Sequence, residues 1–136
     1  MKLTDWKKEF RIEDDGFIRE HANRIGDQNP LHHNAEMAMQ FQKLTGIVMP
    51  GMAILNHITA LIAQEVPGVI ICGIDKARFY RPVYAPTLLS LFFTVSKKKM
   101  RRVEVEIGAI DDNRTAISAT CLLWLPETVR AESIAA

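Results

Sequence analysis

The chain has 136 residues and a mass of 15.4 kDa, and its 48% hydrophobic and 24% charged residues are typical of one globular domain. Seventeen Lys and Arg against 16 Asp and Glu give a formal net charge of +1. This balance excludes the strong positive field with which a protein attracts nucleic acid or an anionic membrane. No repeat or linker divides the sequence, so we expect a single domain over residues 1–136.

The cysteines and the N-terminal region indicate a cytoplasmic protein. Cys72 and Cys121 each lie in an apolar run, which predicts two buried, inert thiols rather than a disulfide or a metal site. The N-terminal residues include no apolar segment of the kind found in secretory signals, and no stretch is long enough to span a membrane. We therefore expect neither secretion nor membrane insertion.

The first 45 residues are polar and mixed, and they predict short helices joined by an irregular loop. Gly26 and Asn29-Pro30 break regular structure, because Pro30 has no N–H and disfavours a helical Asn29. The expected features are a turn at Asp15-Gly16, a helix over 17–24, a loop over 25–33, and a helix N-capped by Asn34 that ends near Lys43, with Gly46 beyond it.

A long apolar helix is expected after Pro50-Gly51. Its apolar residues recur with helical spacing at Met52, Leu55, Ile58, Ile62 and Val66. The stripe covers most of the circumference, which predicts a largely buried helix, and Pro67-Gly68 ends it.

From Val69 onward the apolar period changes to two, which predicts three or four successive antiparallel strands. A buried helix followed by such a meander indicates an α+β fold with the sheet wrapped against the helix. The expected strands are 69–80, 88–96, 103–107 and 117–125, with turns at 82–86, 97–101 and 111–114, and a frayed tail at 127–136.

Asp27 and His32 are candidates for catalysis. They lie five residues apart on a chain that Pro30 bends, so both can face one cleft. A carboxylate and an imidazole can take a proton from water and supply one to carbon near neutral pH, as hydration of a conjugated double bond requires. The spacing alone leaves a structural interpretation open, in which Asp27 caps a turn, Asn29 closes an Asx-turn and His32 is an ordinary loop histidine.

Gly51 opens the apolar helix and is a candidate for binding a carbonyl oxygen. The first N–H groups of a helix are unpaired and lie at the positive end of its dipole, and glycine permits close approach of a ligand to the backbone. The alternative is that Gly51 only helps a tight loop to enter the helix.

Together these residues resemble the MaoC-like dehydratases, which include the (R)-specific enoyl-CoA hydratases. The resemblance covers about residues 20–126 and depends on landmarks that occur in the same order along the chain. They are Gly26-Asp27-x-Asn29-Pro30-Leu31-His32, Ala38, Gly46-Ile47-Val48, Gly51-Met52, and Phe79-x-Arg81-Pro82-Val83.

The resemblance implies a hotdog fold, in which a curved antiparallel sheet wraps a central helix and two chains pair into a homodimer. It also implies that Asp27 and His32 activate one water for addition to a trans-2-enoyl thioester of coenzyme A or an acyl carrier protein, giving the (R)-3-hydroxyacyl product. Gly51 is then the donor to the thioester carbonyl, Thr59 lines the pocket, and Asn29 belongs to the substrate-binding residues. No metal or other cofactor is expected.

Three positions depart from the family pattern: Ile25 replaces a small polar residue, Pro50 replaces a common histidine, and Ala85-Pro86 replaces Gly-Asp. All three lie near the expected substrate site, so acyl length and carrier remain open. A hotdog thioesterase that cleaves the thioester and a non-catalytic acyl-thioester-binding protein are the alternative functions.

Other polar residues favour structural interpretations. A metal site that combines His21, His33 and Asp27 lacks a further ligand at a usual spacing. His57 lies on the buried helix and is expected to be a core or pocket residue. The basic residues of 97–102 are expected to form a solvated turn, with contact to coenzyme A phosphates as the alternative.

Overall fold

The structure, a computed structural model, describes residues 4–127. Helices come first and strands last, except for one strand at the start. The elements are β1 (Trp6–Ile12), α1 (Asp15–Arg24), the short 3-10 helix η1 (Pro30–His32), α2 (Ala35–Gln42), α3 (Gly51–Glu65), β2 (Ile70–Phe79), β3 (Thr87–Lys99), β4 (Arg102–Asp111) and β5 (Arg114–Trp124).

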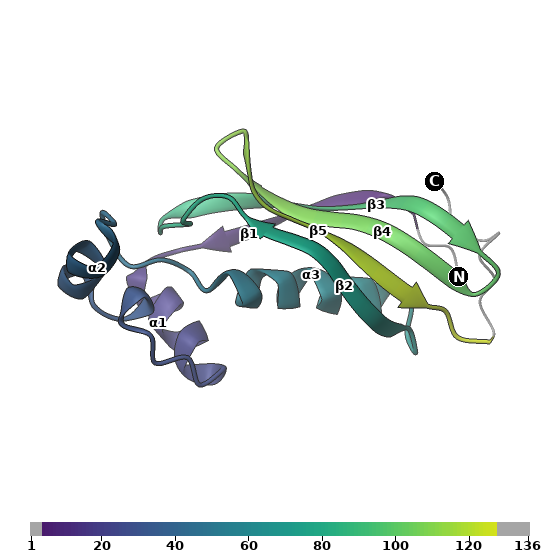
Figure 1. The fold of residues 1–136 in the computed structure, drawn as a ribbon, viewed down its shortest axis with the longest axis horizontal. Helices are drawn as coiled ribbons and strands as arrows, with labels where there is room; N and C mark the ends of the chain where they lie inside the picture. The colour runs from purple at the N-terminus through teal and green to yellow at the C-terminus, as the bar shows by residue number, and fades with distance from the viewer. Residues whose placement is uncertain (1–3, 128–136) are drawn as a thin grey trace.

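The five strands form one antiparallel sheet with the order β1-β3-β4-β5-β2. The sheet curves over α3, which lies along its inner face, while α1 and α2 lie together at one end (Figure 1). The expected α+β fold, with a curved sheet wrapped around a central helix, is confirmed.

The core lies between α3 and the sheet. Helix α3 buries Ala53, Ile54, Leu55, Ile58 and Ile62. Buried sheet residues complete one apolar cluster with them, because alternate residues of each strand face the helix; they include Leu91, Phe93, Val105, Ile107 and Leu123. The helix is less enclosed than its sequence predicts, because Met52 at its start is 62% exposed.

The ends of the short helices agree only in part with the sequence prediction. Asn34 is the N-cap of α2, as expected, and its side chain accepts a hydrogen bond from the Met37 N–H at 3.0 Å. Lys43, in the left-handed conformation, ends α2 where the sequence predicts, with Gly46 beyond the end of the helix. The turn predicted at Asp15-Gly16 is wrong, because the Asp14 side chain caps α1 and both residues lie in its first turn.

Strand β1 was not expected from the sequence. Its central residues are exposed and charged because it is an edge strand that pairs only with β3, so its apolar alternation is weak. The β3–β4 turn is also shorter than predicted: β3 continues to Lys99, and only Met100 and Arg101 connect the strands.

The two cysteines differ in environment. Cys121 is buried as expected, whereas Cys72 is exposed, so the prediction for Cys72 is wrong. Cys72 lies on the edge strand β2, where an apolar side chain can face solvent. None of the helices within 4–127 is long and apolar enough to cross a membrane. The predicted frayed tail, apart from Glu127, lies outside the described residues.

Candidate active site

The loop between α1 and α2 folds tightly around Asp27. The Asp27 N–H donates to the Ala22 carbonyl at 2.8 Å, which fixes the loop to the end of α1. One Asp27 oxygen, Oδ1, accepts the Asn29 N–H at 3.0 Å. Asn29 in turn caps η1 by accepting the Leu31 N–H at 3.1 Å. These bonds leave the second oxygen, Oδ2, to face elsewhere.

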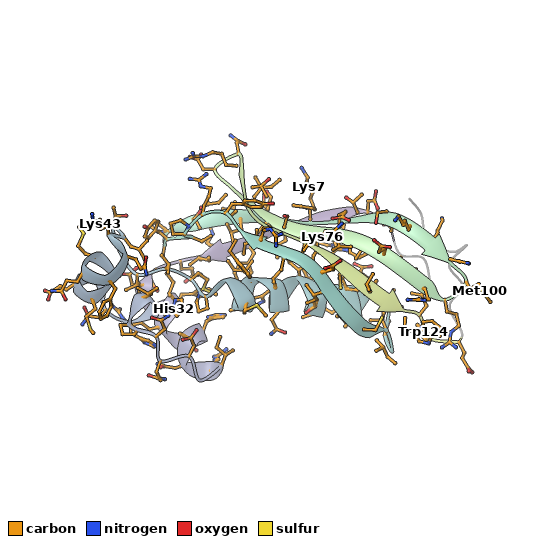
Figure 2. All side chains as sticks on the ribbon, viewed as in Figure 1. Lys7, His32, Lys43, Lys76, Met100 and Trp124 are labelled. Carbon is orange, nitrogen blue, oxygen red and sulfur yellow. The ribbon has the colours of Figure 1, made fainter. Side chains whose placement is uncertain are left out.

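His32 ends η1 and is almost buried, with 9% of its surface exposed. Figure 2 shows it at the end of the molecule that carries the short helices, far from Met100 and Trp124 at the opposite end. Its Nδ1 lies 2.7 Å from the Val48 carbonyl oxygen, and its Nε2 lies 3.3 Å from Asp27 Oδ2. The structure therefore brings the two predicted catalytic residues together.

The bond to Val48 decides which nitrogen of His32 carries the proton. A carbonyl oxygen can only accept, so Nδ1 must be the donor. In the neutral ring Nε2 is then an acceptor, and it faces the carboxylate of Asp27, which is also an acceptor when ionised. Two acceptors side by side are satisfied by a shared proton or by a water that donates one hydrogen to each.

Both side chains open into a cavity of about 390 Å³ at the start of α3. Gly51 lines this cavity, and its N–H has no hydrogen-bond partner among residues 4–127. No side chain caps the helix, because Pro50 stands at the N-cap. The cavity thus combines an acid/base pair with a free backbone donor at the positive end of a helix.

The two other predicted site residues do not line this cavity. Asn29 acts within the loop, where its backbone and side chain hold Asp27 and η1 in place. Thr59 lies two turns along α3, and its hydroxyl donates to the Asn56 carbonyl at 3.0 Å. Its assignment to the substrate pocket stays a prediction.

Three residues that line the cavity come from β2, the loop after β2, and β5. The local sequence pattern predicts no role for them. Phe79 ends β2, Arg81 follows it, and Ile117 lies opposite Phe79 on β5. The Phe79 ring packs directly against the Gly51 α-carbon, leaving no room for a side chain there. Phe79 and Arg81 belong to the Arg-Pro-Val landmark, and this was the only sequence signal for them.

The remaining histidines contact other parts of the fold and do not line this cavity. The His57 ring on α3 packs at a tilt against Phe10, with ring centroids 4.2 Å apart, and its centroid lies 5.5 Å from that of His21. Burial, followed by repulsion from His21, lowers the pKa of His57. His33 Nε2 donates to the Asp27 carbonyl at 2.8 Å and so stabilises the loop between α1 and α2. Residues 4–127 contain no cluster of three or more side chains suited to a metal.

The family model for the MaoC like domain matches residues 16–116. The chain belongs to the MaoC-like domain family. A comparison with curated proteins found no match.

Solved structures agree with this assignment. The (R)-hydratase from A. caviae involved in PHA biosynthesis is 17% identical, with a TM-score of 0.77 over 90% of this chain and 94% of that one. The R-hydratase PhaJ1 from Pseudomonas aeruginosa is 26% identical, with a TM-score of 0.73 over 91% and 82%. The ChsH1-ChsH2 complex from Mycobacterium tuberculosis is 19% identical, with a TM-score of 0.79 over 93% and 100%. The hotdog fold is confirmed, and the family is one of hydratases and dehydratases.

Proposed function

We propose that this MaoC-like protein interconverts trans-2-enoyl and (R)-3-hydroxyacyl thioesters, with one water held between Asp27 and His32. The observation that carries the proposal is the pairing of His32 Nε2 with Asp27 Oδ2 at 3.3 Å while Nδ1 is fixed to Val48. That arrangement presents two acceptors to one water at the cavity wall.

The reaction uses Asp27, His32 and the Gly51 N–H. Asp27 takes a proton from the water while the water oxygen bonds to C3 of the enoyl group. The electron pair of the double bond moves toward the thioester carbonyl oxygen. The Gly51 N–H stabilises the negative charge that develops there, as an oxyanion-hole donor does. A proton held by the Asp27–His32 pair then bonds to C2 on the same face, so that one water is added in total.

The test is hydration of crotonyl-CoA by the wild-type protein, followed as loss of the absorbance of the conjugated thioester, with chiral analysis of the product. The proposal predicts the (R)-3-hydroxy product without release of thiol. Release of free thiol, detected with a thiol reagent, would instead support the thioesterase alternative. Binding of the thioester with no change in either signal would support the non-catalytic alternative.

We also propose that the whole chain is one domain and that it acts as a cytoplasmic homodimer. Strand β2 is an edge of the sheet, and it exposes Ile70 and Ile74. The opposite edge, β1, exposes charged residues, which discourage strand pairing. Two-fold pairing of β2 with its copy would cover this apolar edge. Elution in gel filtration at twice the 15.4 kDa chain mass supports a dimer, and elution at the chain mass contradicts it.

A further inference from the structure

Arg81 lies in the wall of the cavity that contains Asp27 and Gly51. The chain reaches it with strand-like alternation: Phe79 and Arg81 line the cavity, while the intervening Tyr80 turns outward and pairs with Ser118 at 3.0 Å. Arg81 therefore reaches the wall of this cavity because of the path of the backbone beyond β2.

The Arg81 guanidinium has no hydrogen bond or ion pair to any residue of 4–127, and its Nη1 is buried without a partner. Some of the other arginines within residues 4–127 are bonded to the protein. Arg19 donates to the His33 carbonyl at 3.0 Å, and Arg101 donates to the Leu125 carbonyl at 3.0 Å. Asp27 shares the cavity with Arg81 but forms no ion pair with it within the described chain.

Arg81 as a whole is half-buried, but its Nη1 is shielded from solvent and has no partner within residues 4–127. A shielded N–H donor without an acceptor is unfavourable, and an anion that binds there removes that cost. Guanidinium is suited to this task because its planar array of N–H donors matches the two oxygens of a carboxylate or phosphate. The other walls of the cavity are mostly apolar, with Val48, Met49, Ile54 and Val83 among them. Arg81 is thus the cation that a negatively charged substrate group would meet inside this cavity.

We propose, on the basis of the function proposed above, that Arg81 binds an anionic oxygen of the thioester substrate. Two parts of such a substrate carry this chemistry: a carboxylate on the acyl group, or the phosphate of the pantetheine carrier. Arg81 then determines substrate specificity through binding, while Asp27 and His32 perform the proton transfers.

The test compares three thioesters that share one reactive double bond. Crotonyl-pantetheine carries no anion, crotonyl-phosphopantetheine adds the phosphate, and the pantetheine monothioester of fumarate adds a carboxylate. Arg81→Met removes the charge at similar length, and Arg81→Lys keeps a charge without the planar fork. Arg114→Met is the matched control, because Arg114 is exposed at the start of β5, outside the cavity and on a strand other than the proposed dimer edge β2.

Loss of a charge-assisted hydrogen bond should lower kcat/KM for Arg81→Met about tenfold to a hundredfold on one anionic thioester. The affected thioester identifies the source of the anion. For Arg81→Met, kcat/KM on crotonyl-pantetheine should change by less than about twofold. Arg81→Lys should retain part of the wild-type preference for the anionic thioester, and Arg114→Met should match the wild type on all three. An equal loss on all three thioesters, or no loss on any, overturns the proposal.

A comparison of the three thioesters with the wild-type protein provides a test that does not depend on how the variants fold. It should use one of the two anionic thioesters better than the neutral one, and a preference for the neutral thioester contradicts the inference. If the wild type hydrates neither these three thioesters nor crotonyl-CoA, the proposed function has failed. The role of Arg81 is then tested by calorimetry, which compares how the wild type and Arg81→Met bind saturated thioesters. These are the neutral butyryl-pantetheine and the anionic butyryl-phosphopantetheine and succinyl-pantetheine.

Discussion

Replacing Gly51 with alanine adds one methyl group at the mouth of the cavity. The new Cβ would overlap the Phe79 ring, which packs against the Gly51 α-carbon. Because Phe79 lines the cavity and is 48% exposed, the ring can move, and it moves at the expense of the space beside the Gly51 N–H. The perturbation therefore acts on the proposed oxyanion donor and leaves the core in place.

The substitution should affect kcat and stability differently. Removing or blocking one oxyanion donor lowers kcat by about a hundredfold to a thousandfold in enzymes that depend on it. Alanine in a helix interior is more stable than glycine by about 1 kcal/mol, and a position in the first turn gains less. We therefore expect Gly51→Ala to lose most of its activity while its melting temperature stays close to that of the wild type.

The assay is kcat and KM for crotonyl-CoA together with thermal unfolding. Gly46→Ala is the matched control, because a Cβ at Gly46 makes only an ordinary contact, 3.7 Å from the Tyr84 ring, and the residue does not line the cavity. Folded Gly51→Ala protein with nearly wild-type kcat would refute the role of the helix start in the reaction.

Three further predictions concern stability and the thiols. Ile58→Ala removes a fully buried side chain of α3, and it should lower the free energy of unfolding in urea by about 2–5 kcal/mol; a change of a few tenths would contradict the packing described. Burial, and then the charge of His21, lowers the pKa of His57 in the folded chain below its ordinary value of 6.5. As the pH falls, His57 is therefore protonated in the unfolded chain at a higher pH than in the folded chain. Stability should thus fall as pH decreases below that value, and His57→Gln should reduce the slope of urea midpoints against pH; an unchanged slope would be inconsistent with this cause. Burial, followed by the charge effect of Cys72, raises the pKa of the Cys121 thiol to about 11. A thiol reagent at neutral pH should therefore modify Cys121 only after unfolding, and rapid reaction of Cys121 in the folded protein would contradict this expectation.

The sequence predicted those features that depend on a strong local pattern. Helix α3 has an uninterrupted apolar stripe, and β4 and β5 alternate clearly because one face of each is buried. Strand β1 has no such pattern, because its charged residues lie at an exposed edge of the sheet. It is a strand because it pairs with β3, and this pairing leaves no local pattern in the sequence. Cys72 was misjudged for the same reason, because an apolar run on an edge strand does not guarantee burial.

The proximity of Asp27 and His32 was predictable because both residues lie on one short loop. Their actual geometry was not, because it depends on the Val48 carbonyl, 16 residues further along the chain, which orients the His32 ring. Phe79 and Arg81 reach the cavity only through the tertiary fold, so local spacing could not relate them to Asp27.

The central claim is that Asp27 and His32 activate one water, and the kinetics of Asp27→Asn test it most directly. Asparagine keeps the shape of the side chain and loses the base, while Asp112→Asn, in the β4–β5 turn outside the cavity, controls for loss of a carboxylate. With crotonyl-CoA as the substrate and folding verified by circular dichroism, we predict that kcat falls by about a hundredfold or more in Asp27→Asn and is unchanged in Asp112→Asn. Hydration by Asp27→Asn at nearly the wild-type rate would contradict the account.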